Sequence, residues 1–147
     1  MPKLKILAAC EKVIFDQDGP ASLINLFQAM NYRLQDAPLP ERAIAPNQWC
    51  VFTQWEHEPR DVGQEFTQII TVTAPDGSLF AKHEGTFQSN TSEHVQTRTK
   101  MQFTSLPVWQ EGTVAIRAFL KGNDEELGSY NFEVKYLPKD EAIKIEG

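Results

Sequence analysis

Apolar side chains recur at every second position in two stretches near the end of the chain, residues 112–122 and 127–137. The inward positions are Val114, Ile116, Ala118 and Leu120 in the first stretch, and Tyr130, Phe132, Val134 and Tyr136 in the second. This period of two predicts two β-strands, each with one face toward a core and one toward water. Residues 121–126 are charged and turn-forming, so the pair is predicted to be a closing β-hairpin.

Phe132 lies at the centre of that predicted core face. We therefore expect Phe132→Ala to lower the free energy of unfolding by about 3–5 kcal/mol, through lost burial and an unfilled cavity. Glu133→Ala, on the opposite face, is expected to cost less than about 0.5 kcal/mol.

The first half of the chain shows less regular strand patterns. Alternation from Leu4 to Cys10, extended by an apolar run to residue 15, predicts a first strand. Residues 22–34 fit both a helical and a strand spacing, and the lack of a helix stop signal favours a strand. Residues 36–46 contain three prolines and predict a long loop.

The middle of the chain is predicted to hold the centre of a sheet. Residues 49–55 are apolar on both faces, which is typical of a central strand. Residues 66–72 form the next predicted strand, and Pro75-Asp-Gly77 behind it is a hairpin signal.

Residues 79–87 and 95–103 are predicted to pair as a further hairpin. Pairing residues whose numbers sum to 182 places all the inner positions on one face, as a half-buried hairpin requires. The predicted pairs are Leu79 with Phe103, Ala81 with Met101, His83 with Thr99, Gly85 with Thr97 and Phe87 with Val95.

About eight strands and no strong amphipathic helix predict an all-β fold. The pattern favours an antiparallel β-sandwich, immunoglobulin-like or similar, with a β-barrel as the alternative. A chain of 147 residues that is 41% hydrophobic suits one domain, residues 1–147.

The net charge of the chain excludes some classes of partner. A net charge of −6 argues against nucleic acid and against an anionic membrane surface. The Leu-Ala-Ala-Cys10 run imitates a lipoprotein signal, but its apolar core is too short, so we expect a cytoplasmic protein. Cys10 and Cys50 are then expected to be reduced, and to be small core residues in preference to a disulfide or a reactive pair.

No metal or cofactor is predicted. Asp16 and Asp18 resemble the opening of a calcium loop, and whether that loop binds calcium stays open, although the full ligand pattern is absent. The predicted register places His83 and His94 on opposite faces, so they cannot share one ion.

The sequence contains no nucleophile elbow, phosphate loop or Cys-x-x-Cys motif, and we expect no enzyme. The most ligand-like cluster is Trp55, His57, Arg60 and Asp61, where an aromatic ring beside polar groups could bind a carbohydrate-like ligand. The competing interpretation, that Trp49 and Trp55 belong to the core, is favoured because each ring must bury a large apolar area.

Several short motifs are similar to those of a family of small uncharacterised bacterial proteins. They are Cys10-Glu-Lys-Val-Ile-Phe-Asp16, Gly19-Pro-Ala-Ser-Leu-Ile-Asn-Leu-Phe27, Pro75-Asp-Gly77, and Gly112 with Tyr130-x-Phe-x-Val134. The resemblance covers most of the chain and implies a single bacterial β-sandwich domain of no known activity. It carries over no catalytic residue, and it offers no counterpart for the proline-rich residues 36–46.

Two hypotheses of function follow. The first is a non-catalytic binding or interaction module of a bacterial cytoplasmic protein, which associates with itself or adds its polar hairpin edge to a protein partner. Sheets of this kind can associate by edge pairing or by a flat face. The alternative is a small-ligand domain that uses the Trp55–Asp61 region.

Overall fold

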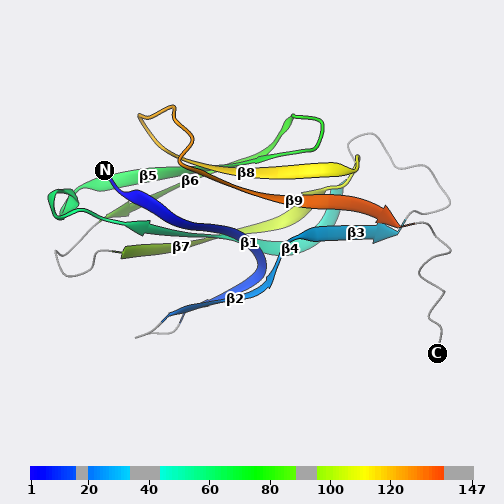
Figure 1. Ribbon diagram of the computed structural model, residues 1–147, viewed down its shortest axis with the longest axis horizontal. Helices are drawn as coiled ribbons and strands as arrows, with labels where there is room; N and C mark the ends of the chain where they lie inside the picture. Colours follow the sequence, from blue (N-terminus) through cyan, green and yellow to red (C-terminus); the bar gives the residue numbers. More distant parts are fainter. Residues whose placement is uncertain (16–19, 34–43, 89–95, 138–147) are drawn as a thin grey trace.

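The computed structural model describes residues 1–15, 20–33, 44–88 and 96–137, and these residues form two facing β-sheets (Figure 1). The strands are β1 (Lys3–Phe15), β2 (Ala21–Leu26), β3 (Ala29–Arg33), β4 (Ile44–Glu56), β5 (Glu65–Thr73), β6 (Leu79–Gln88), β7 (Gln96–Pro107), β8 (Gly112–Leu120) and β9 (Gly128–Leu137). One short 3-10 helix, η1 (Pro59–Asp61), lies between β4 and β5.

One sheet has the order β2-β1-β4-β7 and the other β3-β9-β8-β5-β6. The run β1-β4-β7 matches strands A-B-E of an immunoglobulin domain, and β9-β8-β5-β6 matches G-F-C-C′. The predicted immunoglobulin-like sandwich is therefore confirmed, and two separate sheets replace the alternative of a barrel. The sandwich departs from the prediction in one pair, because β3 runs parallel to β9 (Figure 1).

The closing hairpin has the predicted strands and faces. Val114 lies opposite Phe132, and Ile116 lies opposite Tyr130. Phe132 is 1% exposed, in a core that both sheets share. The Pro75-Asp-Gly77 turn also joins β5 to β6 as predicted, with the left-handed backbone of Gly77 at φ 87°.

Residues 22–34 form strands, as favoured, but the segment divides between the two sheets. β2 pairs with β1, whereas β3 pairs with β9. Asn25 adopts a left-handed conformation, φ 55°, just before the chain crosses over. Phe27 fixes the crossing, because its N–H donates to the carbonyl of Ala9 and its ring is buried.

The pairing predicted between residues 79–87 and 95–103 is wrong. β6 pairs with β5, placing Phe87 opposite Phe66, and β7 pairs with β4, placing Phe103 opposite Trp49. β6 and β7 are edge strands of different sheets. Their inner faces meet across the sandwich instead, where the ring of His83 lies 4.6 Å from that of Phe103.

Candidate functional site

Trp55 belongs to the core. It is fully buried, as is Trp49, and its ring stacks on Phe87 at 5.7 Å. Its indole N–H donates to Oε1 of Gln68 at 2.9 Å. The ring therefore offers no face to a sugar, and the stacking platform that the carbohydrate hypothesis needs is absent from Trp55.

His57 and Asp61 are buried near the end of β4 and in η1. Nε2 of His57 lies 2.6 Å from the hydroxyl of Thr97, and its Nδ1 is buried with no hydrogen-bond partner among the described residues. Burial lowers the pKa of His57 from its usual value, and the charge of Asp61 only partly opposes this. The ring is therefore neutral near pH 7.

The carboxylate of Asp61 is held by several donors. Burial alone would raise the pKa of Asp61, but the backbone N–H of Glu58, the Met1 ammonium group and His57 together keep it below its usual value. The Glu58 N–H lies 2.8 Å away, and the ammonium nitrogen 3.1 Å. Asp61 therefore closes the turn that follows β4.

Arg60 is exposed, and its Nε donates to the Glu58 carboxylate at 2.5 Å. The structure thus brings Trp55, His57, Arg60 and Asp61 to one end of the sandwich, where Arg60 is exposed and the other three side chains are buried. Two cavities near the β1–β2 hairpin are lined by described residues, and none of the four belongs to either lining.

The burial of His57 makes stability depend on pH. The pKa of His57 in the folded state is below its unfolded value of about 6.5. The contribution of His57 to the free energy of unfolding is therefore fully present above about pH 6.5 and is lost as the pH is lowered through that value. We expect the free energy of unfolding, measured by urea titration, to decline between about pH 7 and pH 5, and His57→Gln to flatten this decline. His83→Gln is the matched control, because His83 is exposed although its ring contacts that of Phe103. An unchanged slope in His57→Gln would contradict the assignment.

A buried polar cluster in the core was missed by sequence reasoning. Gln68 of β5 is 2% exposed and faces β4 across the sandwich. Its Oε1 accepts from the hydroxyl of Thr53 at 2.9 Å and from Trp55, while its Nε2 donates to the hydroxyl of Thr99 at 2.7 Å. The sequence could have indicated this cluster, because the alternation of the strand places Gln68 on the inward face between Phe66 and Ile70.

The β1–β2 hairpin bends over the outer face of the four-stranded sheet. Val13 and Leu23 from the hairpin pack on Cys50 and Phe52 of β4 in a second, smaller core. Phe15 extends this contact, with its ring 6.2 Å from that of Phe52. Figure 1 shows the hairpin leaving the two layers at the bottom of the view.

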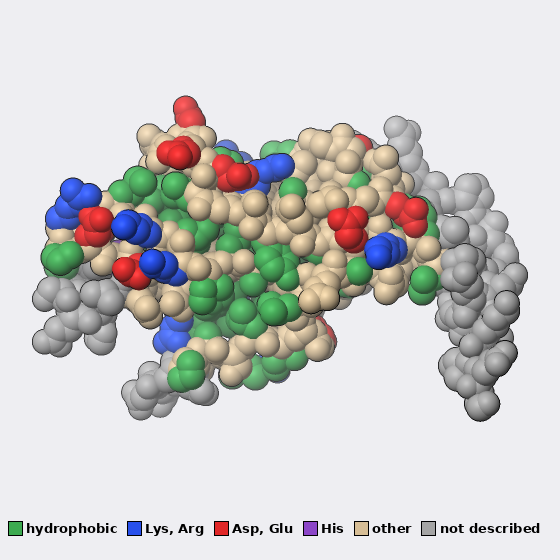
Figure 2. All heavy atoms as spheres, viewed as in Figure 1, with side chains coloured by type: hydrophobic (Ala, Val, Ile, Leu, Met, Phe, Trp, Pro, Cys, Tyr) green, Lys and Arg blue, Asp and Glu red, His purple; other side chains and the backbone are tan. Residues whose placement is uncertain are grey.

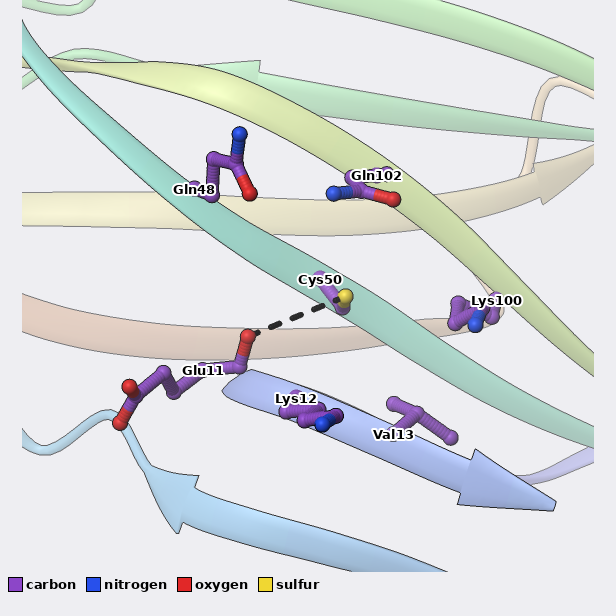
Figure 3. A pocket seen from close by; sticks show the side chains of 7 residues that line it. All are labelled: Glu11, Lys12, Val13, Gln48, Cys50, Lys100 and Gln102. Atoms are coloured by element: carbon purple, nitrogen blue, oxygen red, sulfur yellow. Dashed lines mark hydrogen bonds between the residues drawn. The ribbon is translucent and has the colours of Figure 1, made fainter.

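A cavity of about 340 Å³ opens where the hairpin bends (Figure 3). Its lining is mostly polar and comes from β1, β4 and β7: Glu11, Lys12, Val13, Gln48, Cys50, Lys100 and Gln102. The Glu11 carboxylate points away from the other lining groups and accepts from the Asn25 side chain at 2.5 Å. The cavity therefore presents two ammonium groups, two amides and one thiol.

Among the described residues, strand β2 is an edge strand of the four-stranded sheet, with β1 as its one neighbour. Its sequence, Ala-Ser-Leu-Ile-Asn-Leu, holds no charged residue and no proline. Every other edge strand of the described sheets contains charges: Arg33 in β3, Lys82 and Glu84 in β6, and Arg98 and Lys100 in β7. β2 is thus the edge with the least protection against pairing.

Large apolar side chains are exposed around this edge. Ile24 and Leu26 of β2 are 37% and 51% exposed, and Ile14 and Phe15 of β1 are 40% and 41% exposed. Figure 2 shows apolar side chains gathered over β1 and β2 in the lower centre of the view. We call Ile14, Ile24 and Leu26 the hairpin patch. Phe15 follows Ile14 in the strand and faces the other way, toward Phe52.

The described residues contain no group of three or more side chains placed to hold a metal ion. Asp16 and Asp18, the candidate calcium ligands, lie outside the described residues, as does most of the proline-rich segment. Within the described ranges, no helix has the length and apolar character to cross a membrane.

Three solved structures align with most of this chain at low sequence identity. The Pseudomonas fluorescens alkylpurine DNA glycosylase AlkC, solved bound to DNA containing an abasic site analog, aligns with a TM-score of 0.50 and 11% identity over 91% of this chain and 30% of its own. The immunoglobulin-like protein PA1606 of Pseudomonas aeruginosa aligns with a TM-score of 0.40 and 15% identity over 92% and 97% of the two chains. The beta-glucosidase of Listeria innocua aligns with a TM-score of 0.43 and 11% identity, over 92% of this chain and 17% of its own.

This chain thus spans less than a third of the glycosylase and of the glucosidase. No curated protein matches its sequence. A family model does match, over residues 5–135, which is most of the chain. The chain therefore belongs to DUF6941, a family of unknown function.

Proposed function

We propose that the protein is a non-catalytic interaction module that associates through the free edge of β2, with a second copy of the same chain as the first occupant. The uncharged edge of β2 carries this proposal, because a strand edge with unpaired backbone groups and no charge is a template for another strand. A protein partner that offers an extended segment would use the same backbone bonds.

The charge distribution supports a second copy as the occupant. The chain carries a net charge of −6, so most pairs of surfaces on two copies repel each other. At β2 two identical strands can meet without placing like charges opposite one another. The hairpin patch adds exposed apolar area beside the edge. Six residues make a short pairing, so we expect the association to be weak and to depend on concentration.

The test is a change of charge at the edge. Ile24→Lys places two ammonium groups close together in a paired edge, and we expect it to raise the dissociation constant about tenfold or more. Leu79→Lys is the matched control, because Leu79 is an exposed apolar residue, 55%, on the already charged edge strand β6. Light scattering and sedimentation over a range of concentrations measure both variants.

The proposal is supported if the wild-type protein and Leu79→Lys both form dimers while Ile24→Lys remains monomeric. A wild type that is strictly monomeric at its highest soluble concentration would refute self-association. Dimers that survive Ile24→Lys would place the interface elsewhere.

A further inference from the structure

Cys10 and Cys50 lie directly opposite each other on neighbouring antiparallel strands, β1 and β4. Opposed residues of an antiparallel pair have Cα atoms about 4.5–5.5 Å apart. A disulfide accepts a Cα separation of about 4.4–6.8 Å. Both side chains lie in the same small core, with Val13 and Phe52, so they project from the same face of the sheet. The backbone therefore already has the spacing that a disulfide needs.

The two thiols also point toward the same corner of β1. The S–H of Cys10 donates to the carbonyl of Lys12 at 3.5 Å, and that of Cys50 donates to the carbonyl of Glu11 at 4.0 Å. These two carbonyls belong to adjacent residues, at the bend where the hairpin leaves the sheet. The two cysteines are not joined by a disulfide in this structure.

The thiols differ in their access to solvent. Both are buried, but Cys10 is 0% exposed, whereas Cys50 is 6% exposed and lines the 340 Å³ cavity, as Figure 3 shows. Burial, together with the neighbouring Cys50, raises the pKa of the Cys10 thiol to about 11. An oxidant that enters the cavity therefore meets Cys50 first, while Cys10 remains a protonated thiol beside it.

From this arrangement we infer that Cys10 and Cys50 form a reversible oxidation site, which a small hydroperoxide converts into a cross-strand disulfide. Cys50 first loses its S–H proton to water, and its sulfur then attacks the peroxide oxygen as the thiolate. An S–O bond forms, the O–O bond breaks, and the remaining oxygen leaves as an alcohol or as water after protonation. Cys50 is then a sulfenic acid.

The sulfur of Cys10 attacks that of Cys50 in the second step. The S–S bond forms, the S–O bond breaks, and the leaving hydroxide takes the proton of Cys10 as water. The two thiols together lose two electrons and the peroxide gains two. Cys10 is thus the resolving thiol, and its position opposite Cys50 competes with further oxidation of the sulfenic acid.

The disulfide would join β1 to β4 at the base of the bent hairpin. It would also remove both S–H donors from the carbonyls of Glu11 and Lys12. Oxidation would therefore add a covalent bond and remove two hydrogen bonds at the base of the hairpin that carries the hairpin patch. The thiol chemistry stands whether or not β2 mediates self-association.

The test treats the folded, reduced wild-type protein with hydrogen peroxide and follows thiols and mass. We expect both thiols to disappear from a denaturing thiol titration, and the intact mass to fall by two hydrogen atoms. Peptide mapping should join the segments of Cys10 and Cys50 within one chain, and dithiothreitol should restore both thiols. Cys10→Ala replaces one small buried side chain with another, so this variant should fold. In it, dimedone should trap Cys50 as the sulfenic acid.

Three outcomes would overturn the inference. In the first, the folded wild-type protein keeps both thiols after peroxide treatment. In the second, the disulfide joins two chains and not two cysteines of one chain. In the third, Cys50 is oxidised to sulfinic acid as fast in the wild type as in Cys10→Ala. Self-association measured separately on reduced protein distinguishes a failure here from a failure of the proposed interaction through β2.

Discussion

Phe132→Ala is expected to lower the free energy of unfolding by about 3–5 kcal/mol, because it removes a ring from a closed aromatic cluster. The ring of Phe132 is 1% exposed and meets two others edge to face, Phe27 at 5.4 Å and Trp49 at 5.9 Å. Trp49 belongs to the facing sheet and Phe27 to the crossing between β2 and β3, so the cavity cannot collapse by moving one strand. Urea denaturation followed by tryptophan fluorescence measures the change.

A loss of this size is a large share of the roughly 5–15 kcal/mol that stabilises a domain, so the variant should be partly unfolded near 37 °C. Asn131→Ala is the matched control, because Asn131 is the exposed neighbour on the same strand, and it should cost less than about 0.5 kcal/mol. Glu133 is a less suitable control, since its carboxylate accepts from the Thr113 hydroxyl at 2.5 Å. Equal losses in Phe132→Ala and Asn131→Ala would mean that the register of β9 is wrong.

The strands and inward faces of the closing hairpin could be predicted from the sequence, because its two strands are adjacent in the chain and joined by a short connector. The alternation then determines both the faces and the partner. Val114 and Phe132, predicted to face inward, do lie opposite each other in the core. Local pattern and tertiary structure agree here because one turn fixes the pairing.

The same reasoning failed for residues 79–87 and 95–103, and the reason is geometrical. Alternation tells which residues of a strand face the core, but two strands can share a core as neighbours in one sheet or as facing strands in two sheets. His83 and Phe103 both point inward, as predicted, yet they meet across the sandwich. Gly85 shows the same relation, since a Cβ on it would lie 3.3 Å from the Met101 side chain of the other sheet.

The candidate sites show a similar limit. Trp55 lies on the same face of β4 as Trp49, and that face was identified from the sequence as the favoured core face, so its burial follows from the alternation. The pairing of Cys10 with Cys50 could not be predicted, because it depends on the register of two strands that are far apart in the chain. The unprotected edge of β2 likewise becomes visible only when the order of the strands is known.

Gln68→Leu is expected to lower the free energy of unfolding by roughly 2–4 kcal/mol, although it places an apolar side chain of similar size in the core. Gln68 is 2% exposed, and its Oε1 accepts hydrogen bonds from both Thr53 and the Trp55 indole. Leucine leaves the buried indole N–H with no acceptor, and a buried donor without a partner costs about 1–3 kcal/mol. Gln102→Leu, at an exposed glutamine of β7, is the matched control and should cost less than about 0.5 kcal/mol.

A second change separates the loss of the hydrogen bonds from a simple packing defect. In the Gln68→Leu background, Trp55→Phe removes the orphaned N–H, so the double variant should be more stable than the sum of the two single losses predicts. A coupling of at least about 1 kcal/mol in this direction is expected, measured by urea denaturation of all four proteins. Additive losses would show that the indole N–H finds another partner, and that the polar cluster does not act as one unit within the core. The cycle therefore tests why a glutamine occupies an inward position between Phe66 and Ile70, where the strand pattern calls for an apolar residue.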